Sequence, residues 1–166
     1  MVVLERPGIM IKLSKVRRRE VLIREYRSSD CEELIQLFTA TVHTINSKDY
    51  DEEQLNAWTD SADLEEWDKS LRNHYSLVAC GNNKIIGFGD IDKTGYLDRL
   101  YVHKDFQRKG IAAALCNELE QSVDGSIITH ASVTAKPFFE KRGYKVLKKQ
   151  QVNRKGVLLT NYIMKK

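Results

Sequence analysis

The sequence predicts a mixed α/β fold in which helices cover a central sheet. Several short segments alternate apolar and polar residues, which is typical of half-buried strands. Other segments carry apolar residues at helical spacing. The expected order is a strand, helices, three strands, a helix, a strand, a helix and two strands, and no internal repeat or low-complexity segment interrupts it.

Size and composition fit one domain. The chain has 166 residues, which is enough for a single hydrophobic core. With 42% apolar and 30% charged residues, it is not a disordered chain. We expect an N-terminal extension over residues 1–19, with a basic run at Lys15 to Arg19, and one domain over residues 20–166.

The N-terminal half is predicted to be mainly helical after its first strand. Val21 to Tyr26 alternates like a strand. Ser29-Asp30 offers an N-cap for a helix with apolar positions from Leu34 to Val42. Two further helical pieces are expected, near Asp51 to Trp58 and Leu64 to Leu71.

The C-terminal half is predicted to alternate strands with two helices. The clearest helix is Gly110 to Val123, because its apolar residues form one stripe and Asp124-Gly125 ends it. Ala135 to Lys141 is expected to be a short helix. The expected strands are Ser76 to Cys80, Lys84 to Ile91, Gly95 to Val102, Ser126 to His130, Tyr144 to Val152 and Val157 to Met164.

The junction between the strand ending at Val102 and the helix starting near Gly110 has the composition of a phosphate-binding loop. A helix N-terminus presents unpaired N–H groups and positive dipole character. Gly110 lets a phosphate approach the backbone, while Gln107, Arg108 and Lys109 add donors and positive charge. An ordinary strand-to-helix turn with a solvated basic patch would have the same pattern.

Two motifs give the sequence its resemblance to a known family. Gln107-Arg108-Lys109-Gly110-Ile111-Ala112 resembles the Q/R-x-x-G-x-G/A signature of the GCN5-related N-acetyltransferase (GNAT) superfamily. Ala135 to Tyr144 resembles its A-x-x-F-Y/F-E-x-x-G-F/Y segment. Together with the element order, the likeness covers Val21 to Met164. It implies a GNAT acyl-CoA N-acyltransferase fold, whose central mixed sheet has about six to seven strands, with the fourth and fifth splayed.

The resemblance also implies an activity. Acetyl-CoA would be the co-substrate, and an amine would attack its thioester directly in a ternary complex. Loop residues from Gln107 to Ala112 would bind the pyrophosphate. Main chain of Leu100, Tyr101 and Val102 would align the pantetheine arm and supply an oxyanion donor, with Phe139 packed against that arm.

Several groups are candidates for the base that accepts a proton from the acceptor amine. Asp98 is our first candidate for the base, since it lies two residues from Leu100 and is expected on the same strand face. His130 is a weaker candidate, as are Asp90 and His103, and a water chain would make all four dispensable. An Asp98 carboxylate paired with a nearby cation would have a purely structural role.

The general acid is a departure from the family pattern. Many relatives carry a tyrosine where this chain has Phe139, which cannot donate a proton to the coenzyme sulfur. Tyr144, Tyr162 or water remain possible donors. The sulfur could also leave as a thiolate, because a thiol pKa near about 8.5 tolerates this.

The acceptor pocket of this superfamily is built from the first helices and their loop. That points to His43, Asn46, Tyr50 and Trp58, which combine aromatic and hydrogen-bonding groups suited to a small polar ligand. The string from Thr41 to Trp58 resembles the YafP-type bacterial branch of the superfamily. A small-molecule amine is the expected acceptor. The alternatives are a protein or peptide amine, and a module that binds acyl-CoA without turnover.

Other function classes find less support. The net charge of +4 suits an anionic ligand as well as nucleic acid, and no aromatic residues are interleaved with the basic run, so no nucleic-acid partner is expected. No membrane-length apolar run or signal-peptide pattern is present, so we expect a cytoplasmic protein without a membrane partner. No residues have metal-ligand spacing, so no metal is expected. A homodimer is left open.

Overall fold

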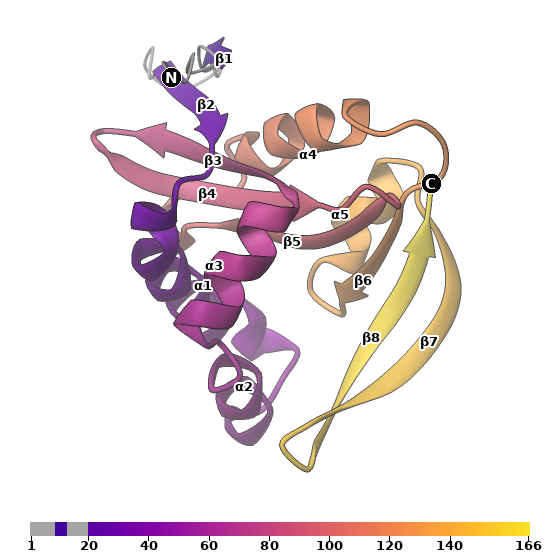
Figure 1. Cartoon of the computed structure of the whole chain (residues 1–166). Helices are drawn as coiled ribbons and strands as arrows, with labels where there is room; N and C mark the ends of the chain where they lie inside the picture. Colours follow the sequence, from indigo (N-terminus) through magenta and orange to yellow (C-terminus); the bar gives the residue numbers. More distant parts are fainter. Residues whose placement is uncertain (1–8, 13–19) are drawn as a thin grey trace.

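The computed structural model describes residues 9–12 and 20–166 (Figure 1). The basic run from Lys15 to Arg19 lies outside these residues. The described residues form a mixed sheet of eight strands in the order β1-β2-β3-β4-β5-β6-β8-β7. Seven of them belong to the expected domain, and β1 comes from the stretch expected as an extension. The predicted fold class, a mixed α/β sheet flanked by helices, is confirmed.

The strands pair in sequence order up to β6. All neighbouring pairs are antiparallel except β5 and β6, which run parallel. The strands are β1 (Ile9–Lys12), β2 (Glu20–Glu25), β3 (Tyr75–Gly81), β4 (Lys84–Ile91), β5 (Tyr96–Val102), β6 (Ile128–Ser132), β7 (Lys145–Arg154) and β8 (Val157–Lys165).

The helices cover both faces of this sheet. The first helical group, over residues 28–73, packs on one face and α4 on the other, while the β7–β8 hairpin forms one edge of the sheet (Figure 1). The helical segments are η1 (Ser28–Asp30), α1 (Cys31–Ile45), η2 (Asn46–Lys48), α2 (Glu52–Thr59), α3 (Leu64–Asn73), η3 (Lys104–Phe106), α4 (Ile111–Gln121) and α5 (Lys136–Lys141).

The sheet divides the hydrophobic core into two clusters. Leu97, Leu115 and Leu119 belong to the cluster beneath α4, whereas Phe38 and Phe88 belong to the cluster beneath α1. Burial of such side chains supplies most of the driving force for folding, at about 1.5–3 kcal/mol for each large apolar side chain.

Two glycines in β4 set how closely α4 approaches the sheet. A Cβ on Gly87 would lie 2.9 Å from the Ile111 side chain, and one on Gly89 would lie 3.0 Å from Leu119. Since both residues are glycine, α4 can pack this closely against β4. Its N-terminus therefore lies directly above β4 and the end of β5.

The parallel pair β5–β6 is paired over only two positions. Tyr96 lies opposite Ile128 and Leu97 opposite Thr129, and the ladder stops there. From Asp98 onward the edge of β5 that faces β6 has no strand partner in the sheet. This is the splay expected between the fourth and fifth strands of the family, which are β5 and β6 here.

Candidate active site

The loop before α4 exposes backbone N–H groups at a helix N-terminus. Gly110 is the N-cap and has a left-handed backbone with φ +81°, which favours glycine. The first helical hydrogen bond runs from the Ala114 N–H to the Gly110 carbonyl. The N–H groups of Ile111, Ala112 and the residue after them therefore have no acceptor within the helix.

Side chains of the same loop fix its shape and add charge. Gln107 Nε2 donates to the Val102 carbonyl at 2.6 Å and so ties the loop to the end of β5. Lys109 lies with its Nζ 4.9 Å from the centre of the Phe106 ring. Arg108 and Lys109 are both exposed, and they place two positive charges beside the unpaired N–H groups. The loop thus has the features of an anion-binding site.

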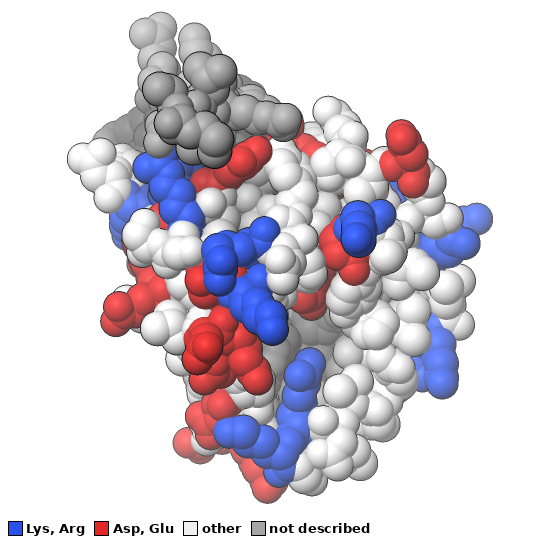
Figure 2. Space-filling model, in the orientation of Figure 1, with Lys and Arg blue, Asp and Glu red and all other residues white. Residues whose placement is uncertain are grey.

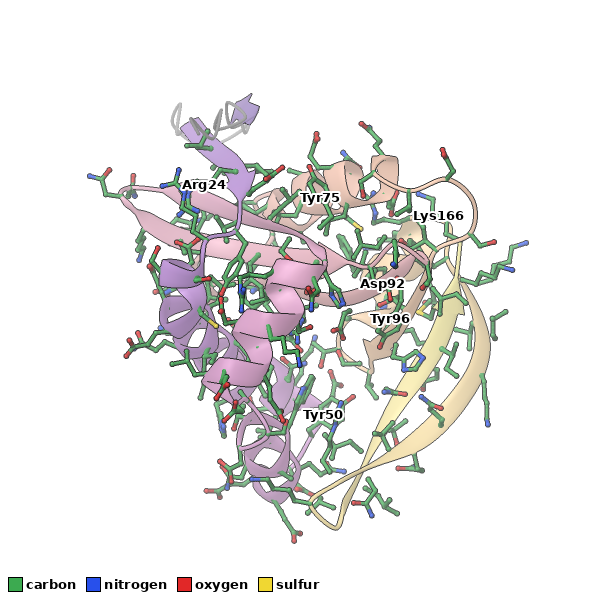
Figure 3. The ribbon with its side chains drawn as sticks, in the orientation of Figure 1. Arg24, Tyr50, Tyr75, Asp92, Tyr96 and Lys166 are labelled. Atoms are coloured by element: carbon green, nitrogen blue, oxygen red, sulfur yellow. The ribbon has the colours of Figure 1, made fainter. Side chains whose placement is uncertain are left out.

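A pocket of about 370 Å³ opens where β5 and β6 separate. It lies between the helical group and the β7–β8 hairpin, where Figure 2 shows a hollow with basic side chains at its rim. Tyr50 reaches this region from the helical side and Tyr96 from β5 (Figure 3). The lining residues are Phe38, Tyr50, Trp58, Ser61, Trp67, Tyr96, Asp98, Arg99, Tyr101, His130, Ser132, Val152, Arg154, Leu159, Thr160 and Asn161.

Asp98 lines this pocket because of a β-bulge. Ile91 lies opposite Leu97 and Asp90 opposite Arg99, so Asp98 is the extra residue of β5. The expectation that Asp98 shares a face with Leu100 is wrong. Leu100 packs against the cluster beneath α4, whereas Asp98 and Arg99 both line the pocket, because the bulge interrupts strict alternation.

The Asp98 carboxyl group is partly buried beside a cation. Its side chain is 30% exposed, and its Oδ2 lies 3.2 Å from Arg99 Nη1. Burial raises the pKa of Asp98, against the opposing positive charge of Arg99. A carboxylate with a raised pKa is a stronger base than an exposed aspartate.

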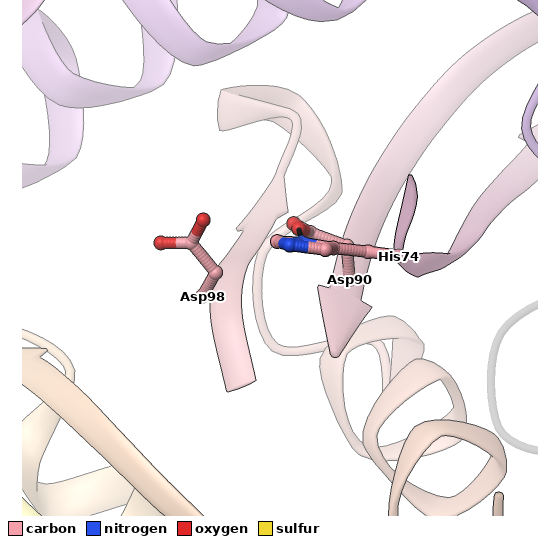
Figure 4. Close-up of side chains that lie close together, drawn as sticks. All are labelled: His74, Asp90 and Asp98. Carbon is pink, nitrogen blue, oxygen red and sulfur yellow. Dashed lines mark hydrogen bonds and ion pairs between the residues drawn. The ribbon is translucent and has the colours of Figure 1, made fainter. Parts of the chain in front are cut away.

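Behind Asp98 lies a buried polar cluster. Asp90, whose side chain is fully buried, accepts hydrogen bonds from His74 Nδ1 at 2.7 Å and from Arg99 Nη1 at 2.9 Å. Figure 4 shows His74 against Asp90, with Asp98 on the adjacent strand. The hydrogen bond that His74 donates to Asp90 raises the pKa of His74. Arg99 also stacks on Trp67 at 4.7 Å, so its guanidinium is held in place from two sides.

The same cluster has the donor set of a possible metal site. His74, Asp90 and Asp98 each offer one ligand atom, and these atoms lie within 4.8 Å of one another. Arg99 Nη1, however, contacts both carboxylates, at 2.9 Å and 3.2 Å. A guanidinium therefore already occupies the position between the carboxylates and neutralises part of their charge. The arrangement fits a buried ion-pair network better than a cation cage.

His130 and Tyr96 face each other across the splay. Their ring centroids are 5.2 Å apart in an edge-to-face arrangement, and both residues line the pocket. Burial raises the pKa of Tyr96 to about 12, so its hydroxyl stays protonated at neutral pH. Tyr96 is thus a pocket phenol that the sequence analysis did not single out.

Two of the predicted acceptor residues line the pocket. The Tyr50 hydroxyl donates to the Thr160 carbonyl at 2.6 Å and accepts from the Val133 N–H at 2.9 Å, which joins the helical wall to β8. Trp58 packs against Tyr50 with ring centroids 5.4 Å apart. These contacts make one aromatic wall.

Other predicted residues lie elsewhere. His43 Nε2 is bonded to Thr59 Oγ1 at 3.0 Å, and Asn46 is buried at the end of α1, so neither lines the pocket. Phe139 is buried in the core beneath α4, in contact with the Tyr144 ring. The Tyr144 hydroxyl donates to Glu120 and does not face the pocket either.

Several lining residues had no local signal in the sequence. Arg99, Arg154 and Asn161 reach the pocket from three different strands. Only the bulge in β5 and the path of the β7–β8 hairpin bring them together, so no spacing along the chain identifies them.

The splayed parallel pair and the helix N-terminus beside it, with its unpaired N–H groups, are the two features that the resemblance to an acyl-CoA-dependent acyltransferase implies. Residues 46–166 match the family model described as an acetyltransferase (GNAT) domain. The chain belongs to the GNAT family and is an N-acetyltransferase.

Individual relatives agree with this assignment. The chain is 34% identical to the N-acetyltransferase YafP of Escherichia coli strain K12 over 146 residues, which are 87% of this chain and 95% of YafP. The crystal structure of a GCN5-related N-acetyltransferase from Rhodopseudomonas palustris is 29% identical, covers 87% of this chain and 93% of its own, and superposes with a TM-score of 0.84.

A further structure adds a coenzyme complex. PaiA N-acetyltransferase from Thermoplasma acidophilum, solved in complex with coenzyme A, is 20% identical and has a TM-score of 0.72 over 88% of this chain and 98% of its own. Members of the family thus bind coenzyme A. No helix among the described residues is long and apolar enough to cross a membrane.

Proposed function

We propose that this N-acetyltransferase moves the acetyl group of acetyl-CoA to the primary amine of a small molecule. The observation that carries the proposal is the pocket of about 370 Å³ at the splay of β5 and β6, with the Asp98 carboxyl group facing it. Its volume lies within the range of pockets that enclose small ligands.

The coenzyme would bind between the N-terminus of α4 and the edge of β5 that faces the splay. The N–H groups of Ile111 and Ala112, with the charges of Arg108 and Lys109, suit a pyrophosphate. The edge of β5 from Asp98 to Val102 offers main-chain groups without a strand partner, which suit the amides of a pantetheine arm. When bound there, acetyl-CoA supplies the activated acyl carbon.

The chemistry then needs few groups from the protein. An ammonium acceptor first loses one proton, which Asp98 accepts. The neutral nitrogen attacks the carbonyl carbon, a C–N bond forms and the C–S bond breaks. The second proton of the nitrogen leaves with the product CoA thiol. A backbone N–H of β5 would donate to the carbonyl oxygen while it carries negative charge.

Contacts that bridge the walls of the pocket favour a small acceptor over a peptide. Tyr50 bridges from the helical wall to β8, and Lys155 Nζ donates to the Asp60 carbonyl at 2.9 Å, so the hairpin is fastened across the pocket. An extended peptide needs an open groove. A protein or peptide acceptor is therefore the second candidate.

The test is CoA thiol release by the purified protein with acetyl-CoA and a panel of small primary amines, beside a panel of peptides with free N-termini. Amine-dependent release with small amines and only background release with peptides is the expected result. Release with peptides alone would contradict the proposal. Calorimetric titration with acetyl-CoA checks coenzyme binding separately.

A further inference from the structure

One basic side chain of the pocket, that of Arg154, has no hydrogen-bond or ion-pair partner among the described residues. Among the charged lining residues, Arg99 contacts both Asp90 and Asp98. Arg154 also lines the pocket, but its guanidinium forms no hydrogen bond or ion pair with any described residue. Its positive charge acts on Asp98 across the pocket. The lining therefore carries one positive charge that is not paired with any side chain in the described part of the chain.

The hairpin holds the backbone of Arg154 in place. Arg154 pairs with Val157 at the last position of the β7–β8 ladder, just before a turn in which Lys155 has φ +50° and Gly156 φ +84°. Lys155 Nζ is bonded to the Asp60 carbonyl, and Gln54 Nε2 donates to the Leu158 carbonyl at 2.9 Å. Both hydrogen bonds hold the end of the hairpin against α2. The backbone of Arg154, from which the guanidinium extends toward the pocket, is therefore fixed.

Two other lining residues present hydrogen-bond acceptors, one on β5 and one on β8. Asp98 offers its carboxylate from β5. Asn161 lines the pocket from β8, and its buried Oδ1 has no hydrogen-bond partner among the residues that the structure describes. A buried polar atom without a partner destabilises the free protein, and a ligand N–H bonded to it would remove that cost. These two groups suit an amine.

We propose that the acceptor is a small zwitterion, whose amine lies against Asp98 and Asn161 and whose carboxylate pairs with Arg154. The inference rests on the proposed function and names the substrate class of the same pocket. Arginine is suited to this role, because its planar guanidinium matches a carboxylate with two parallel hydrogen bonds. The aromatic wall of Tyr50, Trp58 and Trp67 would contact the carbon skeleton between the two charges.

The experiment compares free amino acids with their own carboxamides. Initial rates of CoA thiol release are measured with saturating acetyl-CoA and a panel of L-amino acids, each beside its amide. The protein is tested as parent, as Arg154→Gln and as Lys149→Gln. Lys149 is an exposed cation on the same strand that does not line the pocket, so its variant loses the same charge without touching the site.

The expected result is a ratio of kcat/KM for acid over amide that falls about tenfold to a hundredfold in Arg154→Gln. The ratio in Lys149→Gln should equal that of the parent. In a second arm, Arg154→Glu should lose the acids and gain rate with 1,4-diaminobutane. Because the Arg154 side chain makes no hydrogen bond or ion pair with the described residues, the thermal unfolding temperature of these variants should match that of the parent.

An unchanged acid-to-amide ratio in Arg154→Gln would overturn the inference. So would acetylation of neutral amines but of no amino acid, and in both cases the small-molecule function would stand. Release with peptides only, or with no amine at all, would contradict the proposed function itself and this inference with it.

Discussion

Asp98 and Arg99 are neighbours in the sequence, yet both side chains face the same pocket, with Arg99 Nη1 3.2 Å from Asp98 Oδ2. In a regular strand, adjacent residues point to opposite faces. The bulge opposite Asp90 and Ile91 removes that alternation. The pocket thus obtains a carboxylate and the cation that orients it from two consecutive positions.

Replacing Asp98 by Asn should lower kcat about 10²- to 10⁴-fold without changing the dissociation constant of acetyl-CoA. The base acts only when deprotonated, so the activity of the parent should fall as the pH drops through the raised pKa of Asp98. That acidic limb should disappear in the variant. Steady-state kinetics across pH check this, with the exposed Asp124→Asn as control; an unaltered pH profile would exclude Asp98 as base.

Gly110→Glu should abolish acetyl-CoA binding, because it adds bulk and negative charge at the helix N-terminus. The left-handed backbone also strains any other residue, by about 1–2 kcal/mol. Gly125→Glu is the matched control, since Gly125 has φ +96° and open space around it at the far end of α4. Calorimetric titration should detect binding in the control alone. Equal binding in both variants would show that the coenzyme lies elsewhere.

His74→Asn should make stability less dependent on pH. The pKa of His74 is raised by Asp90, so the ion pair stabilises the native state fully below the unfolded pKa of about 6.5. This contribution is lost as the pH rises through the higher folded pKa. The loss in the variant should therefore be larger at pH 6 than at pH 9 in urea unfolding. His130→Asn serves as the control, and an equal loss at both pH values would contradict the ion pair.

Glu120→Gln should destabilise the protein at neutral pH and weaken its acid sensitivity. Burial alone would raise the pKa of Glu120, but hydrogen bonds from Arg142, Lys166 and Tyr144 outweigh it and lower the pKa to about 2. The resulting stabilisation, at most about 3 kcal/mol, is present above pH 4.5 and is lost as the pH falls toward 2.

Urea unfolding of Glu120→Gln at pH 7 and pH 3 measures this difference. Glu118→Gln, on the same helix and outside the ion pairs that Glu120 makes with Arg142 and Lys166, is the control. If the two variants unfolded alike at pH 7, the network around Glu120 would contribute nothing to stability.

Local sequence patterns were sufficient to predict most of the helices and strands. Lys84 to Ile91 was expected as a strand and is β4, and the helix expected from Gly110 to Val123 is α4, over Ile111–Gln121. Amphipathic periodicity and glycine punctuation depend on near neighbours in the chain, so the sequence displays them directly.

The acceptor side of the site was much less predictable. Tyr50 and Trp58 are predicted to line the pocket and do so. His43 instead bonds to Thr59, and Asn46 is buried at the end of α1. Helix position alone does not say which polar side chain finds a partner inside the protein. That depends on which residues of other elements pack against it.

The sequence by itself determined the fold class, the start of α4 after Gly110 and the family, because each follows from short-range spacing. The tertiary structure decided which charges meet. Asp98 reaches the pocket through a bulge, and Arg154 reaches it at the end of a hairpin more than fifty residues later in the chain. Side-chain direction depends on strand register and on the packing of distant elements, and neither is encoded within a local window.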